Sequence, residues 1–202
     1  MTGTATEVGK TWFSAVTLGL LRHRGVRVAA RKPVQSHAPD AAPTDAEVLA
    51  AATSEEPSMV CRPERTYPIA LAPPMAAEQL GRAAFTIADL VDELTWAPGT
   101  DIGFVEGVGG PRSPLAADGD TVDLVRALGP DLVVIVADAG LGAINAVRLS
   151  RAPFTDVPVI VALNRFDASV DTLHERNRAW LEHREGLAVV TSPTALADRL
   201  SR

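Results

Sequence analysis

The sequence has little of what disulfide-rich, zinc-binding or membrane proteins need. Its single cysteine, Cys61, excludes an internal disulfide framework, and no group of Cys and His residues has the spacing of a zinc site. The N-terminus carries no apolar signal region, and no apolar run approaches the roughly 18 residues that span a bilayer. We therefore expect Cys61 to be a structural or loop residue, and we expect a cytoplasmic protein without a membrane partner.

Long runs of one charge are also absent. The chain has 19 Lys and Arg against 25 Asp and Glu, a net charge of −6, so a nucleic-acid partner is not expected. Aromatic residues make up only 4%, whereas hydrophobic residues reach 47% and charged residues 22%, which is typical of a globular protein rich in helices and buried strands. The length of 202 residues fits a single domain over residues 1–202.

Segments with helical spacing alternate with short runs of Val, Ile and Leu. In residues 10–23, Phe13, Val16, Leu20 and Leu21 recur at helical spacing, and the sequence TDAE from Thr44 is a capping box that predicts a helix to about residue 52. Further helices are expected over about 121–127 and 144–151, and strands in GVRVAARKPV, DIGFVEG, DLVVIVADAGLG and VPVIVALNRFD. This order predicts an α/β fold, with a doubly wound, mostly parallel sheet and helices on both faces.

Polar residues follow four of the predicted strands. Lys32, Glu106, Asp138 and Asn164 each end an apolar run. Because ligands of such sheets bind beyond the carboxyl ends of the strands, we expect these residues to face one crevice. For Asp138 we expect turn or cap chemistry and no catalytic role.

A glycine loop at the start of the chain reads TGTATEVGKT. The backbone N–H groups of such a loop, with the helix dipole behind them, bind phosphate oxygens; Lys10 would reach the β- and γ-phosphates, and the Thr11 hydroxyl would bind Mg²⁺. The usual spacing is G-x-x-x-x-G-K-[ST], whereas five residues separate Gly3 from Gly9 here. With a helix following it, the loop predicts a P-loop nucleotide site.

The strand that should precede this loop is nearly absent, since only Met1 and Thr2 come before Gly3. We expect a truncated first strand in the middle of the sheet. Our hypothesis is that Met1 stands where a strand residue such as Val, read from an alternative start codon, lies.

Five motifs in order over residues 1 to about 167 carry a family resemblance: the glycine loop, KPVQS, TDAE, VEGVGG and ADAGLGAIN. Together they resemble the dethiobiotin synthetases, the ATP-dependent enzymes of biotin biosynthesis. The resemblance implies a homodimeric, Mg²⁺-dependent ligase that uses ATP, or another nucleoside triphosphate such as CTP. Its substrates would be 7,8-diaminononanoate and CO₂ or bicarbonate, joined through a carbamate and a carbamic-phosphoric anhydride.

The resemblance also assigns site residues. Lys10 and Lys32 would be catalytic. Mg²⁺ would be held by Thr11, Asp45 and Glu106, and substrate by Thr6, Lys32, Ser36 and Asn145, the last across the dimer interface. The nucleotide would contact Glu7, Val8, Gly9, Lys10, Thr11, Trp12, Asp45, Glu106, Gly107, Val108, Gly109, Asn164 and Arg165. As aromatic side chains, Trp12, Trp96 and Trp180 are expected to pack in the core or between helices.

Two departures from the family pattern keep alternatives open. The first is the nearly absent first strand. The second is at the C-terminal end, where relatives carry a Gly-Glu-Ile-Pro-like loop near the base and the corresponding GLAVVTSPTALADRL lacks it. A nucleotide-binding switch similar to the partitioning ATPases is one alternative, although Thr-Glu stands where those proteins have a second loop lysine. An inactive scaffold relative is another, against which the retention of Lys10, Thr11, Lys32 and Glu106 speaks.

Overall fold

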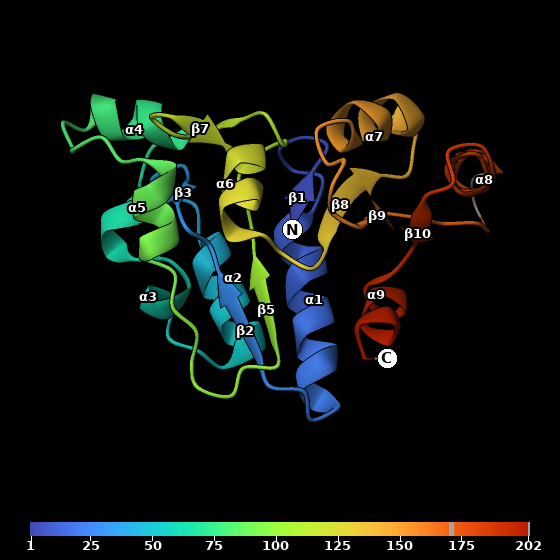
Figure 1. The fold of residues 1–202 in the computed structure, drawn as a ribbon, viewed down its shortest axis with the longest axis horizontal. Helices are drawn as coiled ribbons and strands as arrows, with labels where there is room; N and C mark the ends of the chain where they lie inside the picture. The colour runs from blue at the N-terminus through green and yellow to red at the C-terminus, as the bar shows by residue number, and fades with distance from the viewer. Residues whose placement is uncertain (170–171, 202) are drawn as a thin grey trace.

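The largest sheet is parallel and has the strand order β1-β8-β9-β10 (Figure 1). The structure, a computed structural model, describes residues 1–169 and 172–201. The strands are β1 (Thr2–Gly3), β8 (Val133–Asp138), β9 (Val159–Asn164) and β10 (Ala188–Val190). All three pairings are parallel. Burial of β8 on both faces explains its continuous apolar run, and the predicted α/β fold is confirmed.

A second parallel ladder pairs β2 (Val28–Arg31) with β5 (Ile102–Val105). Met1 connects this ladder to the four-stranded sheet. The Met1 nitrogen donates to the Val105 carbonyl at 2.7 Å, and the Gly107 N–H donates to the Met1 carbonyl at 3.0 Å. The short first strand expected from the sequence is therefore present, with only Ile135 and Val136 of β8 as its partners. Since it is so short, the expected sheet is split into two ladders.

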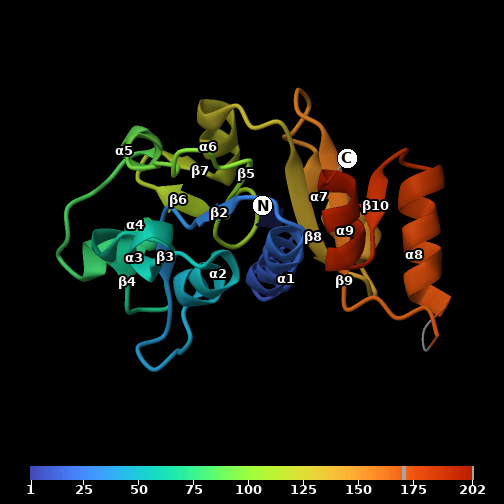
Figure 2. The same cartoon turned by 90° about the horizontal axis from the view of Figure 1, so that it is seen from below.

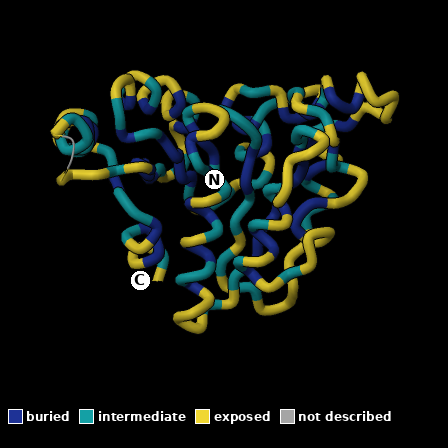
Figure 3. Tube along the Cα trace, turned by 180° about the vertical axis from the view of Figure 1, so that it is seen from behind, coloured by how far each residue is buried: buried dark blue, intermediate teal, exposed yellow. Residues whose placement is uncertain are grey.

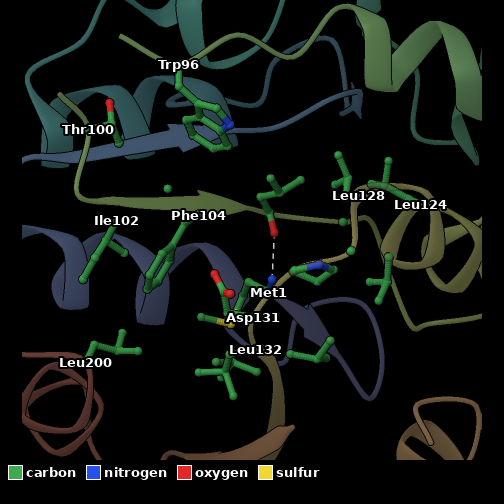
Figure 4. A pocket seen from close by; sticks show the side chains of 18 of the residues that line it. Met1, Trp96, Thr100, Ile102, Phe104, Leu124, Leu128, Asp131, Leu132 and Leu200 are labelled. Atoms are coloured by element: carbon green, nitrogen blue, oxygen red, sulfur yellow. Dashed lines mark hydrogen bonds between the residues drawn. The ribbon is translucent and has the colours of Figure 1, made fainter. Parts of the chain in front are cut away.

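A cavity of about 650 Å³ lies between β5 and the first two residues of β8. Figure 4 shows Met1 at this cavity, its hydrogen bond to Val105 drawn as a dashed line, with Phe104 on one side and Leu132 on the other. The lining is mainly apolar, and Leu124 and Leu128 of α6 contribute to it. β1 pairs only with Ile135 and Val136, in the middle of β8, and Val133 and Val134 before them line the cavity.

Helices lie on both sides of the strands. Figure 2 shows α1 (Lys10–His23), α2 (Asp45–Thr53) and α9 (Pro193–Leu200) side by side on one face, with α6 (Thr121–Leu128) on the other. The remaining helices are α3 (Pro57–Val60), the 3₁₀ turn η1 (Pro63–Arg65), α4 (Pro73–Gln79), α5 (Ile87–Asp92), α7 (Ala143–Arg151) and α8 (Thr172–His183). Short ladders pair β3 (Gln35–Ser36) with β4 (Thr66–Tyr67) and β6 (Pro114–Ala116) with β7 (Gly119–Asp120).

The buried stripe of α1 differs from the predicted one. Phe13, Leu18 and Leu21 are fully buried, but Val16 is 37% exposed, because the helix is rotated so that the stripe continues through Thr17 and Leu18. The capping box of α2 is confirmed, since the Thr44 hydroxyl accepts from the Glu47 N–H and the Glu47 carboxylate accepts from the Thr44 N–H.

Burial is concentrated in the central strands and on the inner faces of the helices, as Figure 3 shows. Cys61 is buried, and burial raises the pKa of its thiol to about 11, so the thiol is protonated at neutral pH. The prediction for the tryptophans was wrong: Trp12, Trp96 and Trp180 are 41–54% exposed. Among the described residues, no helix combines the length and apolarity needed to cross a membrane.

The replacement Ile135→Ala in the centre of β8 is expected to lower the free energy of unfolding by about 2–5 kcal/mol, because a fully buried side chain leaves a cavity. Urea unfolding measures this change. The control Leu80→Ala, at a 41% exposed position, should change it by less than about 0.5 kcal/mol. Equal losses in both variants would contradict the placement of β8 in the core.

Candidate active site

The four polar residues that end strands lie at one edge of the sheet. In the ladder of β2 and β5, Arg31 is paired with Val105, so the next residues, Lys32 and Glu106, follow the two strands at the same level. In the ladder of β8 and β9, the last residues, Asp138 and Asn164, are paired with each other. The Lys32 ammonium is 2.9 Å from a Glu106 carboxylate oxygen. Lys32 and Glu106 meet as expected, because parallel strands present their carboxyl ends on the same side. Asp138 and Asn164 end the other ladder and are not among the residues that line a pocket with Lys32.

The glycine loop leads directly into α1. Gly9 is the N-terminal cap with φ 89°, in the left-handed region that glycine tolerates best, and no side chain caps the helix or adds an acidic group to its first turn. Its first N–H groups are thus left for a ligand, and an anion is the ligand that a helix N-terminus favours. Gly3 is also required, because a Cβ there would lie 2.7 Å from Val8 Cγ2.

Thr11, Asp45 and Glu106 meet beside the loop. The Thr11 hydroxyl is 2.8 Å from Asp45 Oδ1 and 2.7 Å from Glu106 Oε1, so oxygens from α1, α2 and the end of β5 converge. Glu106 is 1% exposed, and its second oxygen accepts from the Ser14 hydroxyl at 2.8 Å. Sequence reasoning missed Ser14, although it follows Thr11 by three residues and therefore shares its helix face.

Lys32 is buried among these carboxylates. Its ammonium contacts Asp45 Oδ2 at 2.7 Å and Glu106 Oε1 at 2.9 Å, and it donates to the Gly107 carbonyl at 3.2 Å. Burial alone would lower the pKa of Lys32, but the charges of Glu106 and Asp45 outweigh it and raise that pKa. Burial alone would raise the pKa of Asp45, but the charge of Lys32 and the hydrogen bonds from Lys32 and Thr11 outweigh it and lower that pKa. Lys32 therefore stays a cation.

Lys10 is the second buried ammonium, at 7% exposure, and it donates to the Ala5 carbonyl at 3.1 Å. Its pKa is lowered, first by burial and then by the positive charge of Lys32. Two cations held this close together in a pocket are suited to a ligand that carries several negative charges.

A pocket of about 730 Å³ opens beside the loop, a volume suited to a small-molecule ligand. It contains most of the residues predicted for the site: Thr6, Glu7, Gly9, Lys10, Thr11, Trp12, Lys32, Ser36, Asp45, Val108 and Gly109. Residues 70–73, Ser113 and Pro114 also line it and were not predicted, because a Pro-rich loop and a short hairpin give no chemical signal in a sequence.

The predicted substrate residues are divided between two places. Thr6 and Ser36 line the pocket, and the Ser36 hydroxyl donates to the Leu71 carbonyl at 2.5 Å. Asn145 is exposed on α7 and does not line the pocket of its own chain. An Asn145 contact would therefore have to come from a second copy.

The predicted base contacts lie on the other side of the loop. The buried Asn164 amide donates to the Val8 carbonyl at 2.9 Å, and the exposed Arg165 donates to the Glu7 carbonyl at 2.8 Å. Asp138 accepts from the Gly140 N–H at 2.9 Å, which is the turn chemistry expected of it, and its other oxygen pairs with Arg165 at 2.8 Å.

The donor set near Thr11 fits a magnesium ion. One hydroxyl and two carboxylates are hard oxygen ligands, and Mg²⁺ takes a few of these with waters completing its shell. Within residues 1–169 and 172–201, no three His, Cys, Asp or Glu side chains gather at one point.

Comparison with known sequences shows the family to which the chain is similar. A family model described as "AAA domain" matches residues 1–192. The chain is 39% identical over 158 residues to the "ATP-dependent dethiobiotin synthetase BioD" of Xanthomonas euvesicatoria, covering 75% of this chain and 69% of that protein. The protein of the same description from Haloferax mediterranei is 36% identical over 197 residues, covering 95% of this chain and 81% of that protein.

Comparison with solved structures supports the fold. The signal recognition particle receptor FtsY from Elizabethkingia anophelis superimposes with a TM-score of 0.52 over the whole of this chain and 64% of that one. At 13% sequence identity this similarity concerns the fold alone.

The replacement Lys32→Met should lower the free energy of unfolding by about 3–5 kcal/mol, because Glu106 would keep a buried charge without a partner. The double variant Lys32→Met with Glu106→Gln removes that charge and should lose less. Urea unfolding of the two variants and the unaltered chain measures these losses. A double variant at least as unstable as the single one would refute the ion pair between Lys32 and Glu106.

Proposed function

The chain belongs to the ATP-dependent dethiobiotin synthetases, and we propose that it closes the ureido ring of dethiobiotin from 7,8-diaminononanoate and CO₂ in the pocket beside the glycine loop. The observation that carries this proposal is that Lys10, Thr11, Lys32 and Asp45 line that pocket together, with Glu106 in contact with Thr11 and Lys32. Residues 1–202 would act as one domain, and a cytoplasmic location is part of the same proposal.

Phosphates of ATP, or of another nucleoside triphosphate such as CTP, would bind the open N-terminus of α1. The backbone of residues 7–12 supplies N–H donors, and the segment from Gly107 to Gly109 would line the opposite wall. The support is the uncapped first turn, whose donors have no side-chain partner. Asn164 and Arg165 would lie at the nucleoside end of the site, where they contact the loop carbonyls.

Magnesium would be held by Thr11, Asp45 and Glu106. When bound, the ion supplies positive charge beside the phosphates and lowers the cost of charge that develops there. Lys32, which now neutralises Asp45 and Glu106, would be released to contact the reacting groups.

The two lysines would stabilise charge in the reaction. One amine of the diamine would take up CO₂ as a carbamate and lose a proton. The carbamate oxygen would attack the γ-phosphorus of ATP and displace ADP, and the second amine would then attack the carbonyl carbon of the mixed anhydride and displace inorganic phosphate, which closes the ring. Lys32 would hold the carbamate and Lys10 the transferring phosphoryl group; the support for these roles is that both are buried cations at the pocket. Thr6 and Ser36 would hydrogen-bond the diamine.

A homodimer would complete the site, because Asn145 lies outside the pocket of its own chain. The same helix and the turn before it expose apolar side chains: Leu141 is 93% and Leu149 is 69% exposed. Such exposure at neighbouring positions is typical of an interface. Asn145 would then reach the substrate carboxylate of the second copy.

The two alternatives are not favoured. A partitioning-type ATPase switch or an inactive scaffold would leave unexplained why relatives described as dethiobiotin synthetases share most of this chain.

Turnover tests the proposal directly. The purified protein with 7,8-diaminononanoate, bicarbonate, Mg²⁺ and ATP or CTP should form dethiobiotin, detected by mass. Lys10→Met should lower kcat by at least about 100-fold, because charge stabilisation on the phosphoryl group is lost, and chelation of Mg²⁺ should abolish turnover. A folded, ATP-binding protein that forms no dethiobiotin would refute the activity.

The dimer is tested separately. Leu149→Asp should convert a dimer to a monomer in sedimentation velocity and raise the KM for the diamine, because Asn145 would no longer reach it. Met59→Asp, at a 51% exposed position on α3, is the matched control and should do neither. An unaltered chain that sediments as a monomer yet turns over would contradict the shared site.

A further inference from the structure

Two successive carbonyls of the glycine loop are held by side chains from the end of β9. The Glu7 carbonyl accepts from Arg165 at 2.8 Å, and the Val8 carbonyl accepts from Asn164 at 2.9 Å. In a planar trans peptide the carbonyl and the N–H point in opposite directions. Holding these two carbonyls toward β9 therefore turns the N–H groups of Val8 and Gly9 the other way, toward the pocket where phosphates would bind.

The loop is not relaxed in this conformation. Glu7 has φ 61° and Arg165 has φ 55°, in the left-handed region that residues other than glycine seldom adopt. A strained backbone persists only where surrounding contacts hold it. The bond between these two residues is such a contact.

Arg165 is itself anchored by Asp138. Its guanidinium pairs with Asp138 Oδ2 at 2.8 Å, and Asp138 Oδ1 accepts from the Gly140 N–H at 2.9 Å. That N–H bond and then the arginine lower the pKa of Asp138, so the carboxylate is charged at neutral pH. A chain of contacts thus runs from the end of β8 through Arg165 to the loop.

This chain of contacts adds little to global stability. The side chains of Arg165 and Asp138 are 60% and 48% exposed, and exposed ion pairs contribute little to the free energy of unfolding. The contacts are therefore better explained by what they orient than by what they stabilise.

We propose that Arg165 is a positioning residue for nucleotide binding, which holds the Glu7 carbonyl away from the pocket so that the Val8 N–H faces the phosphates, with Asp138 as its anchor. The inference rests on the proposed use of a nucleoside triphosphate, and it assigns Arg165 a role through the loop backbone. Asn164 does the same for the next peptide, but it is buried and is less easily varied without loss of packing.

The test is the binding of ATP, measured by calorimetry in the absence of the diamine. Arg165→Met keeps an unbranched side chain on the same backbone and should weaken ATP binding about tenfold, the scale of one charge-assisted hydrogen bond. Arg165→Lys, which can keep one of the two contacts, should lose less. Asp138→Asn should weaken binding in the same direction, and in the Arg165→Met background it should add nothing.

The matched control is Arg24→Met. Arg24 forms an exposed ion pair with Asp198 at 2.7 Å, at the far end of α1 and roughly 20 Å of helix from the loop, so ATP binding should be unchanged. Thermal melting of each variant checks that it is folded. Should Arg165→Met not fold, Arg165→Lys and Asp138→Asn carry the same comparison.

In the turnover assay, Arg165→Met should raise the KM for ATP and leave the KM for the diamine unchanged. Unchanged ATP binding in the Arg165 variants, or tighter binding in Asp138→Asn, would overturn the positioning role; the latter would mean that Arg165 contacts the nucleotide directly. Because ATP binding is measured without turnover, a failure of the proposed ligase activity would be seen separately.

Discussion

The ion pair between Lys32 and Glu106 is the interaction on which the arrangement of the site depends. Both side chains are at most 2% exposed, so each charge would be costly without the other. Glu106 also accepts from Thr11 and Ser14, and Lys32 also contacts Asp45. One buried pair thereby joins α1, α2 and the ends of β2 and β5. A hydrophobic replacement of similar size could stabilise the fold as well or better, so the retention of two buried charges is best explained by their chemistry.

The phosphate side of the pocket is built from backbone and not from side chains. An uncapped helix, and a loop in which Glu7 has a left-handed backbone, present N–H donors that would otherwise be unsatisfied. This arrangement has a cost in conformational strain, which contacts from the ends of β8 and β9 offset. The residues at the ends of β8 and β9 hold the glycine loop in its conformation, and the N–H groups of that loop would bind the phosphates. Arg165 and Asn164 are the two contacts that make this link.

Much of the fold and part of the site could be predicted from sequence because the signals were local. Continuous apolar runs predicted β8 and β9, and TDAE predicted the start of α2. The rule that parallel strands end at the same edge of a sheet predicted that Lys32 and Glu106 lie close together. Other features had no local signal. The rotation of α1 that exposes Val16 is set by the sheet it packs against, and the tryptophans were expected inside although their positions are half exposed. The short strands β3, β4, β6 and β7 consist of two or three residues each, too few for any periodicity.

The sequence by itself determined the order of the elements, the glycine loop and the residue types available for phosphate and metal, since these depend on spacing of a few residues. Only the tertiary structure decided which of them act together. The Thr11 hydroxyl meets Glu106 from 95 positions away, and Arg165 meets Glu7 from 158 positions away. Only the tertiary structure showed that β1 reaches just two residues of β8 and leaves a cavity beside Met1. Contacts of this range depend on how whole strands and helices pack, and packing is a property of the assembled chain.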